Sequence, residues 1–320
     1  MTRPRLGERL RRRAGGLALR AFFEGLARGT ALLPAARKAI AGVDVVRDVP
    51  YRASGLDAHR LDVWRPRESH APRPVVLYVH GGAFRILSKD THWVMALAFA
   101  RRGYAVFCIN YRLAPRHRYP AAIEDVCAAW RWVLANAARF GGDPRRAIIA
   151  GESAGGNLAT SLAVASSYAR PEPWARAVFD EPLRPRAVAP LCGVLQVRDS
   201  ARFARRRPLP LWVTDRLEEV EHGYVGRAPT PATPDLADPL LVLEQGPPDR
   251  ALPPFFASVG TSDPLLDDTR RLGAALDRLG VKNDVRYYAG EPHAFQALVH
   301  RPAARRSWSD LFAFVDPLVR

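Results

Sequence analysis

A serine between two glycines is the strongest chemical signal in this chain. The segment Gly151-Glu152-Ser153-Ala154-Gly155 is a G-x-S-x-G pattern that follows a short apolar run and precedes a run of small residues. The first run predicts a strand and the second predicts a helix. A strand, a sharp turn and a helix around this pattern are typical of a nucleophile elbow, which holds a serine hydroxyl exposed on a strained turn. We therefore predict that Ser153 is a nucleophile.

A serine nucleophile needs donors for the negative charge that forms on the attacked carbonyl oxygen. The apolar run 74–79 ends in His80-Gly81-Gly82-Ala83-Phe84, and glycines after a strand leave backbone N–H groups unshielded. We predict that the N–H groups of Gly81, Gly82 and Ala154 form an oxyanion hole. The alternative is that the two glycines only make a tight turn at the end of a strand.

A histidine base and an orienting acid are expected after the serine in this arrangement. Asp263 follows the predicted strand 254–260, and His293 lies in the loop after the predicted strand 283–288. Both residues therefore lie at carboxyl ends of strands, on the edge where open α/β sheets place their active sites. We predict that His293 takes the proton of Ser153 and that Asp263 fixes the imidazole tautomer.

Other titratable residues compete for these two roles. His222 lies in a polar helical stretch and His300 lies beyond His293, and surface positions are expected for both. Asp267 and Asp268 lie one turn into a predicted helix, where acidic side chains interact favourably with the helix dipole. The candidate acid itself has a structural alternative, because it directly precedes a proline and so also fits a helix N-cap.

These motifs resemble the hormone-sensitive-lipase-like branch of the α/β-hydrolases, also called the bacterial type IV esterases. The resemblance covers roughly residues 45 to 320. It rests on segments that follow the family's order: HGGAF at 80–84, Asn110 to Pro115, Tyr119 to Ala122, Asp125, Gly141 to Pro144, GESAGGNLA from 151, Asp263 to Leu265, and His293. The combination is far more specific than any one of these motifs.

The resemblance implies a serine esterase that hydrolyses carboxylic esters, often of short or medium acyl chains, without a cofactor or a metal. It also implies that His80, Tyr111 and Arg112 support the oxyanion loop, with Arg112 as the side chain that braces it. A hydrolase of amides, lactones or acetylated natural products would use the same triad, and the sequence does not separate these substrates. Ligand receptors of this fold, known in plants, lose the catalytic histidine, whereas His293 is present here.

Three positions depart from the family's usual pattern. Ala83 replaces a third oxyanion-loop glycine, so we expect its methyl group to restrict the acyl group of the substrate. Ala294 replaces the glycine that usually follows the catalytic histidine, and Glu152 stands where aspartate is common. None of the three changes removes a catalytic group. Phe84 and Trp212 join Ala83 as expected walls of an acyl pocket, although plain packing explains both aromatic residues equally well.

The alternation of predicted strands and helices indicates an α/β-hydrolase fold, with a central, mostly parallel, eight-stranded sheet and helices on both faces. We expect the core to comprise residues 43–195 and 251–320. A helical lid is expected from residues 1–42 and from a proline-rich insertion at 196–250. The expected strands lie near 43–49, 60–64, 75–80, 105–110, 146–151, 187–191, 254–260 and 283–288, and the expected helices near 121–139, 153–168, 264–279 and 302–318.

The composition fits one globular enzyme, because 320 residues at 48% hydrophobic can bury a large core. No apolar run of about 18 residues is present, so no membrane-spanning helix is expected. Cys108, Cys127 and Cys192 have no regular spacing, which predicts buried thiols in reducing, cytoplasmic surroundings rather than a disulfide frame or a metal site. The expected partner is a small-molecule ester, and the sequence leaves a homodimer open.

The net charge of +16 is concentrated in two clusters of arginines. A basic amphipathic segment can bind weakly to an anionic membrane surface, but a lid helix with a solvated arginine face is the more frequent case, and both interpretations stay open. Nucleic-acid binding is rejected because no recognition motif accompanies the charge. The first cluster, interleaved with leucine and phenylalanine, is Arg3, Arg5, Arg9, Arg11, Arg12, Arg13 and Arg20; the second is Arg202, Arg205, Arg206 and Arg207.

Overall fold

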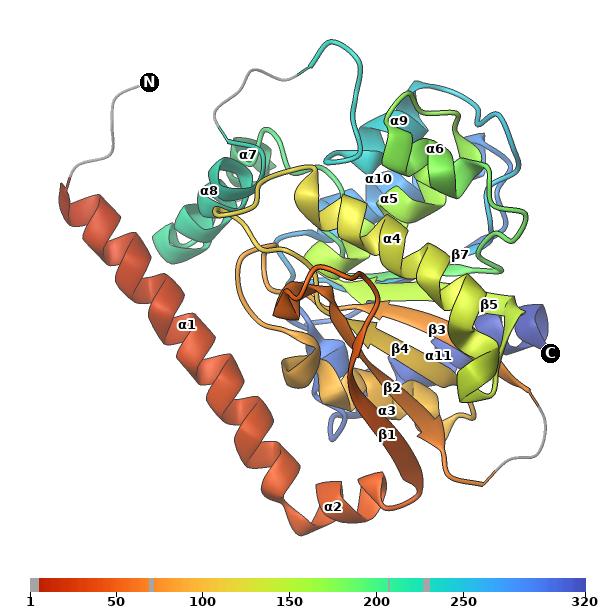
Figure 1. Cartoon of the computed structure of the whole chain (residues 1–320). Coiled ribbons are helices and arrows are strands. Elements are labelled where there is room, and N and C mark those ends of the chain that lie inside the picture. Colours follow the sequence, from red (N-terminus) through yellow and green to blue (C-terminus); the bar gives the residue numbers. More distant parts are fainter. Residues whose placement is uncertain (1–5, 69–71, 207, 227–230) are drawn as a thin grey trace.

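A single eight-stranded sheet forms the centre of the molecule (Figure 1). In the computed structural model, which describes residues 6–68, 72–206, 208–226 and 231–320, every predicted strand is present. The strands are β1 (Val43–Pro50), β2 (Arg60–Pro66), β3 (Arg73–Val79), β4 (Ala105–Ile109), β5 (Gly142–Glu152), β6 (Val188–Leu191), β7 (Phe255–Gly260) and β8 (Asn283–Tyr288).

The strand order across the sheet is β1-β2-β4-β3-β5-β6-β7-β8. Strand β2 is antiparallel to both of its neighbours, and all other pairs are parallel. Parallel strands end at the same edge of a sheet, so the carboxyl ends of β3, β5, β6, β7 and β8 form one rim. The predicted mostly parallel α/β-hydrolase fold is confirmed.

Alternation along the central strands divides the apolar side chains into two cores. On β3, Val75, Leu77 and Val79 belong to one core, whereas Val76 and Tyr78 belong to the other. Successive residues of a strand point to opposite faces, so a run that is apolar at every position predicts burial on both. All five side chains are fully buried, as this pattern requires.

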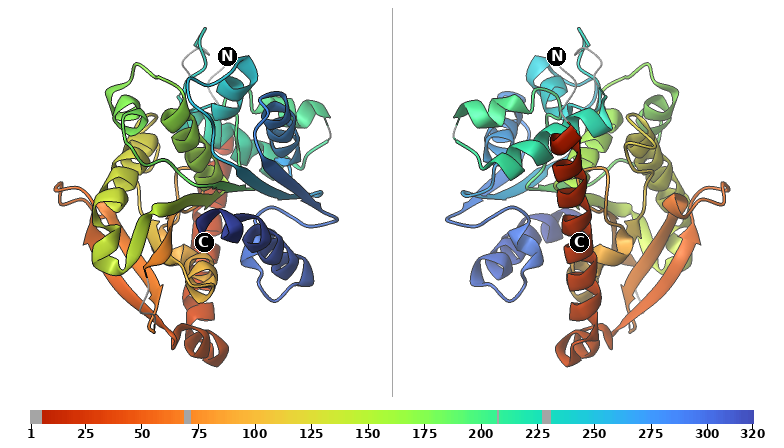
Figure 2. Two further views of the ribbon diagram at one scale, coloured as in Figure 1. Left: turned by 90° about the vertical axis from the view of Figure 1, so that its right-hand side faces the viewer. Right: turned by 90° about the vertical axis from the view of Figure 1, so that its left-hand side faces the viewer.

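Helices cover both faces of the sheet (Figure 2). Helices α4 (Ala121–Asn136), α5 (Ala154–Ser167), α6 (Pro173–Phe179) and α10 (Leu266–Arg278) contribute to the first core. Helices α3 (Trp93–Arg101) and α11 (Pro302–Val319) contribute to the second. The four helices that were predicted by residue range are present as α4, α5, α10 and α11. Helices α3 and α6 were not predicted by range.

The lid segments lie outside these layers. Helix α1 (Leu6–Leu32) runs along one side of the molecule and is followed by the short α2 (Pro34–Ile40) (Figure 1). Helix α1 contacts α8 (Leu211–Tyr224), which follows α7 (Ala201–Arg206). The carbonyl of Ala27 accepts a hydrogen bond from Trp93 Nε1 at 3.1 Å, which fastens the later part of α1 to the core.

One helix of the predicted insertion belongs to the core instead. Helix α9 (Pro239–Gln245) packs against α5 and α10. Among the described residues, no helix is long and apolar enough to cross a membrane. The three cysteines are free and buried, as the sequence predicts.

Candidate active site

Ser153 occupies a sharp turn between β5 and α5. Its backbone angles, φ 53° and ψ −116°, are strained for a residue with a side chain. The flanking glycines are sterically required, because a Cβ on Gly155 would lie 2.0 Å from the carbonyl oxygen of Val79. A Cβ on Gly151 would lie 2.4 Å from the carbonyl oxygen of Gly155. The segment 151–155, which we call the nucleophile elbow, therefore has the geometry that its sequence predicts.

The structure brings Ser153, His293 and Asp263 together at the rim. His293 Nε2 lies 2.9 Å from Ser153 Oγ, and His293 Nδ1 lies 2.8 Å from Asp263 Oδ2. Asp263 is fully buried after β7, and its second oxygen accepts a hydrogen bond from the N–H of Leu265 at 2.8 Å. This bond closes a turn before α10 (Leu266–Arg278), whose N-cap is Leu265, so the alternative role of Asp263 as a helix N-cap is wrong. The arrangement can carry a proton away from the serine hydroxyl.

Opposing effects set the pKa of His293. Burial lowers the pKa of the imidazole, but the carboxylate of Asp263 at Nδ1 and the neighbouring Cys192 together raise it more, so the pKa lies well above its ordinary value of 6.5. A carboxylate at this position also favours the tautomer with the proton on Nδ1, which leaves Nε2 free to accept the serine proton.

The oxyanion loop, His80 to Phe84, differs from the prediction at its first glycine. The N–H of Gly81 donates to His92 Nε2 at 3.2 Å, so this group is already engaged. The N–H groups of Gly82, Ala83 and Ala154 have no acceptor within the part of the chain that the structure describes. Gly82 has φ 110°, and a Cβ there would lie 2.1 Å from the carbonyl oxygen of Ile86. The available donors are therefore Gly82, Ala83 and Ala154.

Tyr111 supports the oxyanion loop, in agreement with the role predicted for it. Its hydroxyl donates to the carbonyl of His80 at 2.9 Å, and its ring stacks on the His80 ring with centroids 4.3 Å apart. A second bond joins the two loops, from the N–H of Ala114 to the carbonyl of Phe84 at 2.8 Å. Burial, assisted by nearby His92, lowers the pKa of His80 to about 3, so its ring stays neutral.

Arg112 does not brace the oxyanion loop directly, so that prediction is wrong. Its guanidinium donates to Asp125 and Glu124, each at 2.8 Å, at the start of α4. Asp125 is fully buried and also lies 3.0 Å from His59 Nε2. A buried carboxylate needs several partners, and Arg112, Arg52 and His59 supply them. The effect of Arg112 on the oxyanion loop therefore passes through the backbone of the loop that carries Tyr111.

Of the two aromatic residues predicted for the acyl pocket, Phe84 is misplaced, and the role of Trp212 stays a prediction. Phe84 is fully buried and stacks on Tyr224 with ring centroids 3.8 Å apart, so it presents no surface to a substrate. Trp212 lies on α8 with 67% of its surface exposed. The local sequence around Phe84 could not predict its packing against Tyr224, which lies 140 positions away. Ala83 is partly buried beside the core, and its effect on the acyl group stays a prediction.

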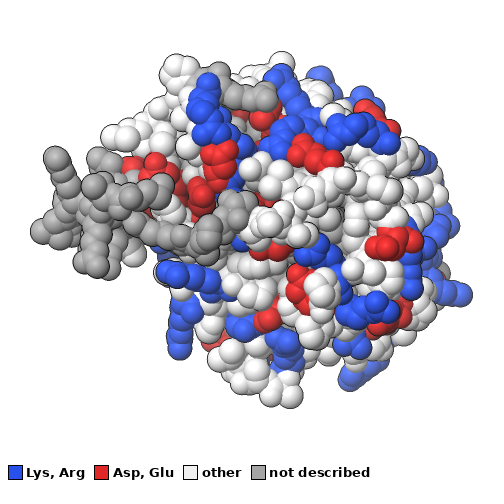
Figure 3. Space-filling model, turned by 90° about the horizontal axis from the view of Figure 1, so that it is seen from above, with Lys and Arg blue, Asp and Glu red and all other residues white. Residues whose placement is uncertain are grey.

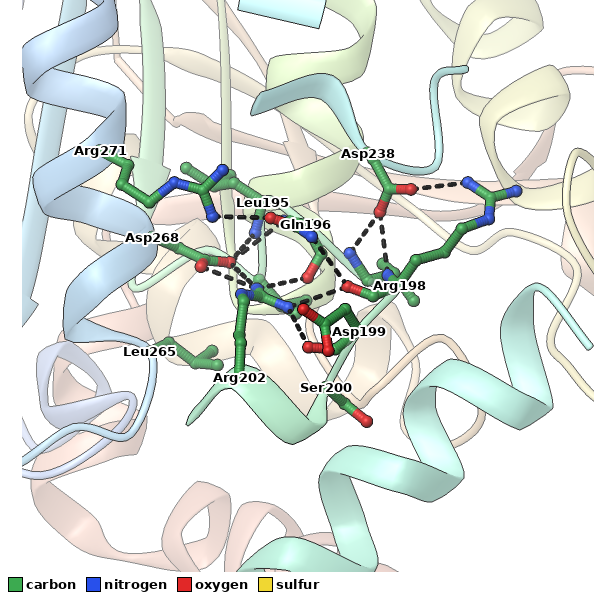
Figure 4. Close-up of polar contacts among 12 residues, drawn as sticks. Leu195, Gln196, Arg198, Asp199, Ser200, Arg202, Asp238, Leu265, Asp268 and Arg271 are labelled. Carbon is green, nitrogen blue, oxygen red and sulfur yellow. Dashed lines mark hydrogen bonds and ion pairs between the residues drawn. The ribbon is translucent and has the colours of Figure 1, made fainter. Parts of the chain in front are cut away.

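Asp268 has a structural role that was not predicted from the sequence. It is fully buried and accepts hydrogen bonds from Arg202 at 2.7 Å and from the N–H groups of Leu195 and Gln196 at 2.8 and 3.1 Å (Figure 4). Burial raises the pKa of Asp268 although Arg202 opposes the shift. The prediction that Asp268 acts mainly on the helix dipole is therefore wrong, because the carboxylate joins the base of the lid to α10.

The second arginine cluster is divided by the structure. Arg202 is buried, so it does not belong to a solvated face. Arg205 is exposed and pairs with Asp199 at 2.5 Å, as a solvated arginine face predicts. The side chain of Arg206 and all of Arg207 lie outside the described residues, as do the side chains of the arginines from 3 to 13.

The thiol of Cys192 lies beside Asp263 and His293, so the three side chains together are candidate ligands for a metal ion. Its sulfur and the nearest ligand atoms of Asp263 and His293 lie within 4.8 Å of one another. Burial raises the pKa of the thiol, and a protonated thiol is a poor metal ligand. The other two side chains already bind each other, so the chemistry of this group favours proton transfer over metal binding.

The comparisons with known proteins agree with this geometry. The profile of a family described as the alpha/beta hydrolase fold matches residues 76–297. The chain belongs to this family. It is 34% identical over 245 residues to the carboxylesterase NlhH of Mycobacterium tuberculosis, an alignment that covers 75% of this chain and 69% of the relative.

Solved structures narrow the assignment within the α/β-hydrolases. The esterase LipW from Mycobacterium marinum superimposes with a TM-score of 0.75 at 28% identity, over 95% of this chain and 90% of that one. An esterase from the bacterial hormone-sensitive lipase family gives a TM-score of 0.71 at 28% identity, over 94% and 91% of the two chains. This α/β-hydrolase is therefore a carboxylesterase-type serine hydrolase of the hormone-sensitive-lipase-like branch.

Proposed function

We propose that this hydrolase cleaves carboxylic esters through an acyl-enzyme formed on Ser153, with His293 as the general base and Asp263 as its orienting acid. The observation that carries the proposal is the continuous chain of contacts, 2.9 Å from Ser153 Oγ to His293 Nε2 and 2.8 Å from His293 Nδ1 to Asp263. This geometry allows His293 to accept the hydroxyl proton while the oxygen attacks the ester carbonyl.

The proposed reaction has two stages that use the same groups. Attack by Ser153 places a negative charge on the former carbonyl oxygen, and the N–H groups of Gly82, Ala83 and Ala154 stabilise it. His293 then gives its proton to the leaving alcohol, and the acyl group remains on the serine. In the second stage His293 takes a proton from water while the water oxygen attacks the acyl-enzyme. It then returns this proton to Ser153 Oγ as the carboxylic acid leaves.

The proposed substrates are esters with short or medium acyl chains. The support is the family and the methyl group of Ala83, which occupies a glycine position in the oxyanion loop. Deacetylation or lactone or amide cleavage of a specialised metabolite is the second candidate, because the same triad serves these bonds. The retained His293 argues against a receptor that only binds a ligand.

Initial rates on p-nitrophenyl esters from acetate to palmitate test the proposal. Ser153→Ala is expected to lower kcat by at least about 10^4-fold with the fold intact by circular dichroism. Ser309→Ala, at an exposed position on α11, is the matched control and keeps the wild-type rate. Ala83→Gly is expected to move the rate maximum towards longer acyl chains. Hydrolysis that survives Ser153→Ala would refute the acyl-enzyme.

We also propose weak contact between the lid helices and an anionic lipid surface. The support is the exposure of Leu17, Phe22 and Leu26 on α1 and of Leu211 and Trp212 on α8, two helices that contact each other. Apolar side chains combined with a net charge of +16 match the chemistry of an anionic bilayer surface. On the face seen in Figure 3, basic side chains are interspersed with acidic ones, a pattern that suits weak attraction.

Co-sedimentation with vesicles tests the lipid contact. The full chain is expected to pellet with phosphatidylglycerol vesicles more than with phosphatidylcholine vesicles, and less in high salt because screening weakens exposed charges. A chain without residues 1–20 is expected to pellet less. Equal pelleting of the two forms would end this proposal and leave a solvated lid helix.

A further inference from the structure

The oxyanion loop and the nucleophile elbow share a buried histidine that the proposed mechanism does not use. His92 ends the 3₁₀ helix Lys89–His92, which follows the oxyanion loop in the chain. Its Nε2 lies 3.2 Å from the backbone nitrogen of Gly81 and 3.2 Å from Glu152 Oε1. Gly81 belongs to the oxyanion loop, and Glu152 directly precedes Ser153. One ring nitrogen therefore touches both halves of the site.

The opposite side of the imidazole is fixed by its own helix. His92 Nδ1 lies 3.1 Å from the carbonyl oxygen of Ser88 and 2.9 Å from Thr91 Oγ1, whose hydroxyl itself donates to that carbonyl at 2.7 Å. We assign the proton to Nδ1 because the Ser88 carbonyl can only accept. In the neutral ring, Nε2 is then the acceptor that the N–H of Gly81 needs.

The helix that carries His92 is itself firmly anchored. Lys89 Nζ is buried and pairs with Asp48 and Asp62 at 2.9 Å each. The backbone N–H of Lys89 also donates to Asn110 Oδ1 at 2.8 Å. These bonds hold the 3₁₀ helix against β1, β2 and the end of β4, so the position of His92 is set independently of the oxyanion loop.

Glu152 completes the link on the side of the nucleophile. Its side chain is buried and packs against the first glycine of the oxyanion loop, where a Cβ on Gly81 would lie 2.5 Å from Oε1. Burial raises the pKa of Glu152, but His92 and His293 together lower it more, so the net shift is downwards. The two hydrogen bonds are alternatives: a neutral ring accepts from Gly81 and only packs against Glu152, whereas a ring protonated at Nε2 donates to Glu152. Nε2 contacts both segments in either state.

We propose that His92 is a positioning residue, which links Gly81 to Glu152 and thereby sets the oxyanion loop at the correct distance from Ser153. The inference rests on the proposed function. Oxyanion donors act only when they lie about 2.7–3.1 Å from the position of the charged oxygen. Because Gly82 and Ala83 follow Gly81 directly, a rotation of the Gly81 peptide moves both donors away from that position. Substrate binding in the ground state depends less on this distance.

Substitutions of His92 and Glu152 test the inference in the full-length enzyme. His92→Phe keeps much of the ring volume but loses the acceptor, and we expect kcat on p-nitrophenyl butyrate to fall roughly 10- to 100-fold while KM changes less than about twofold. His92→Gln retains a polar group and is expected to recover part of kcat. Glu152→Gln is expected to lower kcat in the same direction. His300→Phe, at an exposed histidine, is the matched control.

A second readout separates positioning from general stability. A trifluoromethyl ketone forms a charged oxygen on the nucleophilic serine, so its affinity is expected to fall in His92→Phe by the same factor as kcat/KM. An unchanged kcat in folded His92→Phe overturns the inference. So does a lower kcat with unchanged ketone affinity and a lower melting temperature, since that pattern indicates a structural role alone.

The remaining outcomes are also decisive. If His92→Phe does not fold, His92→Gln and Glu152→Gln carry the test, and wild-type values of kcat and ketone affinity in both overturn the inference. Wild-type hydrolysis that does not depend on Ser153 refutes the proposed function itself. Serine-dependent hydrolysis with an unaffected His92→Phe refutes only the role of His92.

Discussion

The catalytic rim and the outer lid, which consists of α1 and α8, are held in different ways. At the rim, Asp263 and the oxyanion loop each have several polar partners, and most of the groups involved are buried. On the outer lid, Leu17, Phe22 and Trp212 are mostly exposed, and the side chain of Trp93 bonds the later part of α1 to the core. Buried hydrogen bonds therefore fix the catalytic rim, whereas the exposed apolar side chains of α1 and α8 are packed lightly.

The largest effect is expected at the rim, for Asp263→Asn. The amide can no longer hold the imidazole in the tautomer that accepts a proton, so kcat is expected to fall by about 10^4-fold with the fold intact. Steady-state rates on p-nitrophenyl butyrate and circular dichroism check this. Asp267→Asn, on the adjacent helix, is the comparison substitution. If the two variants lose activity equally, the special role of Asp263 is refuted.

Two phenylalanines test the comparison in terms of stability. Phe84 is fully buried behind the oxyanion loop, whereas 62% of the surface of Phe22 on α1 is exposed. Phe84→Ala is expected to lower the free energy of unfolding by about 3–5 kcal/mol, and Phe22→Ala by less than about 0.5 kcal/mol. Urea denaturation measures both. Similar losses for the two variants would break the contrast between rim and lid.

The base of the lid is expected to behave like the rim. Arg202→Leu leaves the carboxylate of Asp268 buried without its guanidinium, which is expected to cost about 3–5 kcal/mol of unfolding free energy. Arg205→Leu removes an exposed pair and is expected to leave the free energy of unfolding almost unchanged. A double substitution, Arg202→Leu with Asp268→Leu, is expected to recover much of the first loss. If Arg202→Leu and Arg205→Leu change the free energy of unfolding equally, Arg202 belongs to the solvated arginine face that the sequence predicts.

The smallest expected effect is a shift in the pH profile. A protonated His293 cannot accept the proton of Ser153, so activity falls as pH decreases through the pKa of this residue. Because Asp263 raises that pKa above 6.5, the acid limb of kcat/KM is expected above pH 6.5, and each further unit of acidification lowers the rate about tenfold. Asp263→Asn is expected to move the limb to lower pH, whereas Arg205→Leu leaves it in place. A wild-type limb below pH 6.5 would contradict the assignment.

Local patterns explain why the fold and the triad could be predicted from the sequence. The central strands are apolar at every position, and the residues of the triad lie at strand ends or in the next loop. Those features depend on neighbours in the chain. Asp268 and Arg202 are separated by 66 positions, and no periodicity joins them, so their pairing could not be predicted.

Local sequence patterns also could not predict which acceptor the N–H of Gly81 would find. The sequence around Gly81 indicates an unshielded N–H, but its acceptor is a histidine eleven positions away on another turn of chain. The partner of Arg112 was missed for the same reason, because Asp125 lies across a loop in α4. A signal was present for His92: a buried carboxylate beside the nucleophile needs a partner, and the segment after the oxyanion loop carries a histidine.

Helix α11 has a consequence for the newly made chain. It covers the second face of the sheet with Trp308, Leu311 and Val315, and its Asp316 accepts hydrogen bonds from Arg102 at 2.9 Å and Tyr104 at 2.7 Å. On the ribosome, all eight strands and the whole triad are synthesised before these 18 residues. Until α11 is added, the part of the second core that Trp308, Leu311 and Val315 complete stays open to water, although α3 already covers its other part. Burial of the second core is therefore finished only after the whole triad has been made.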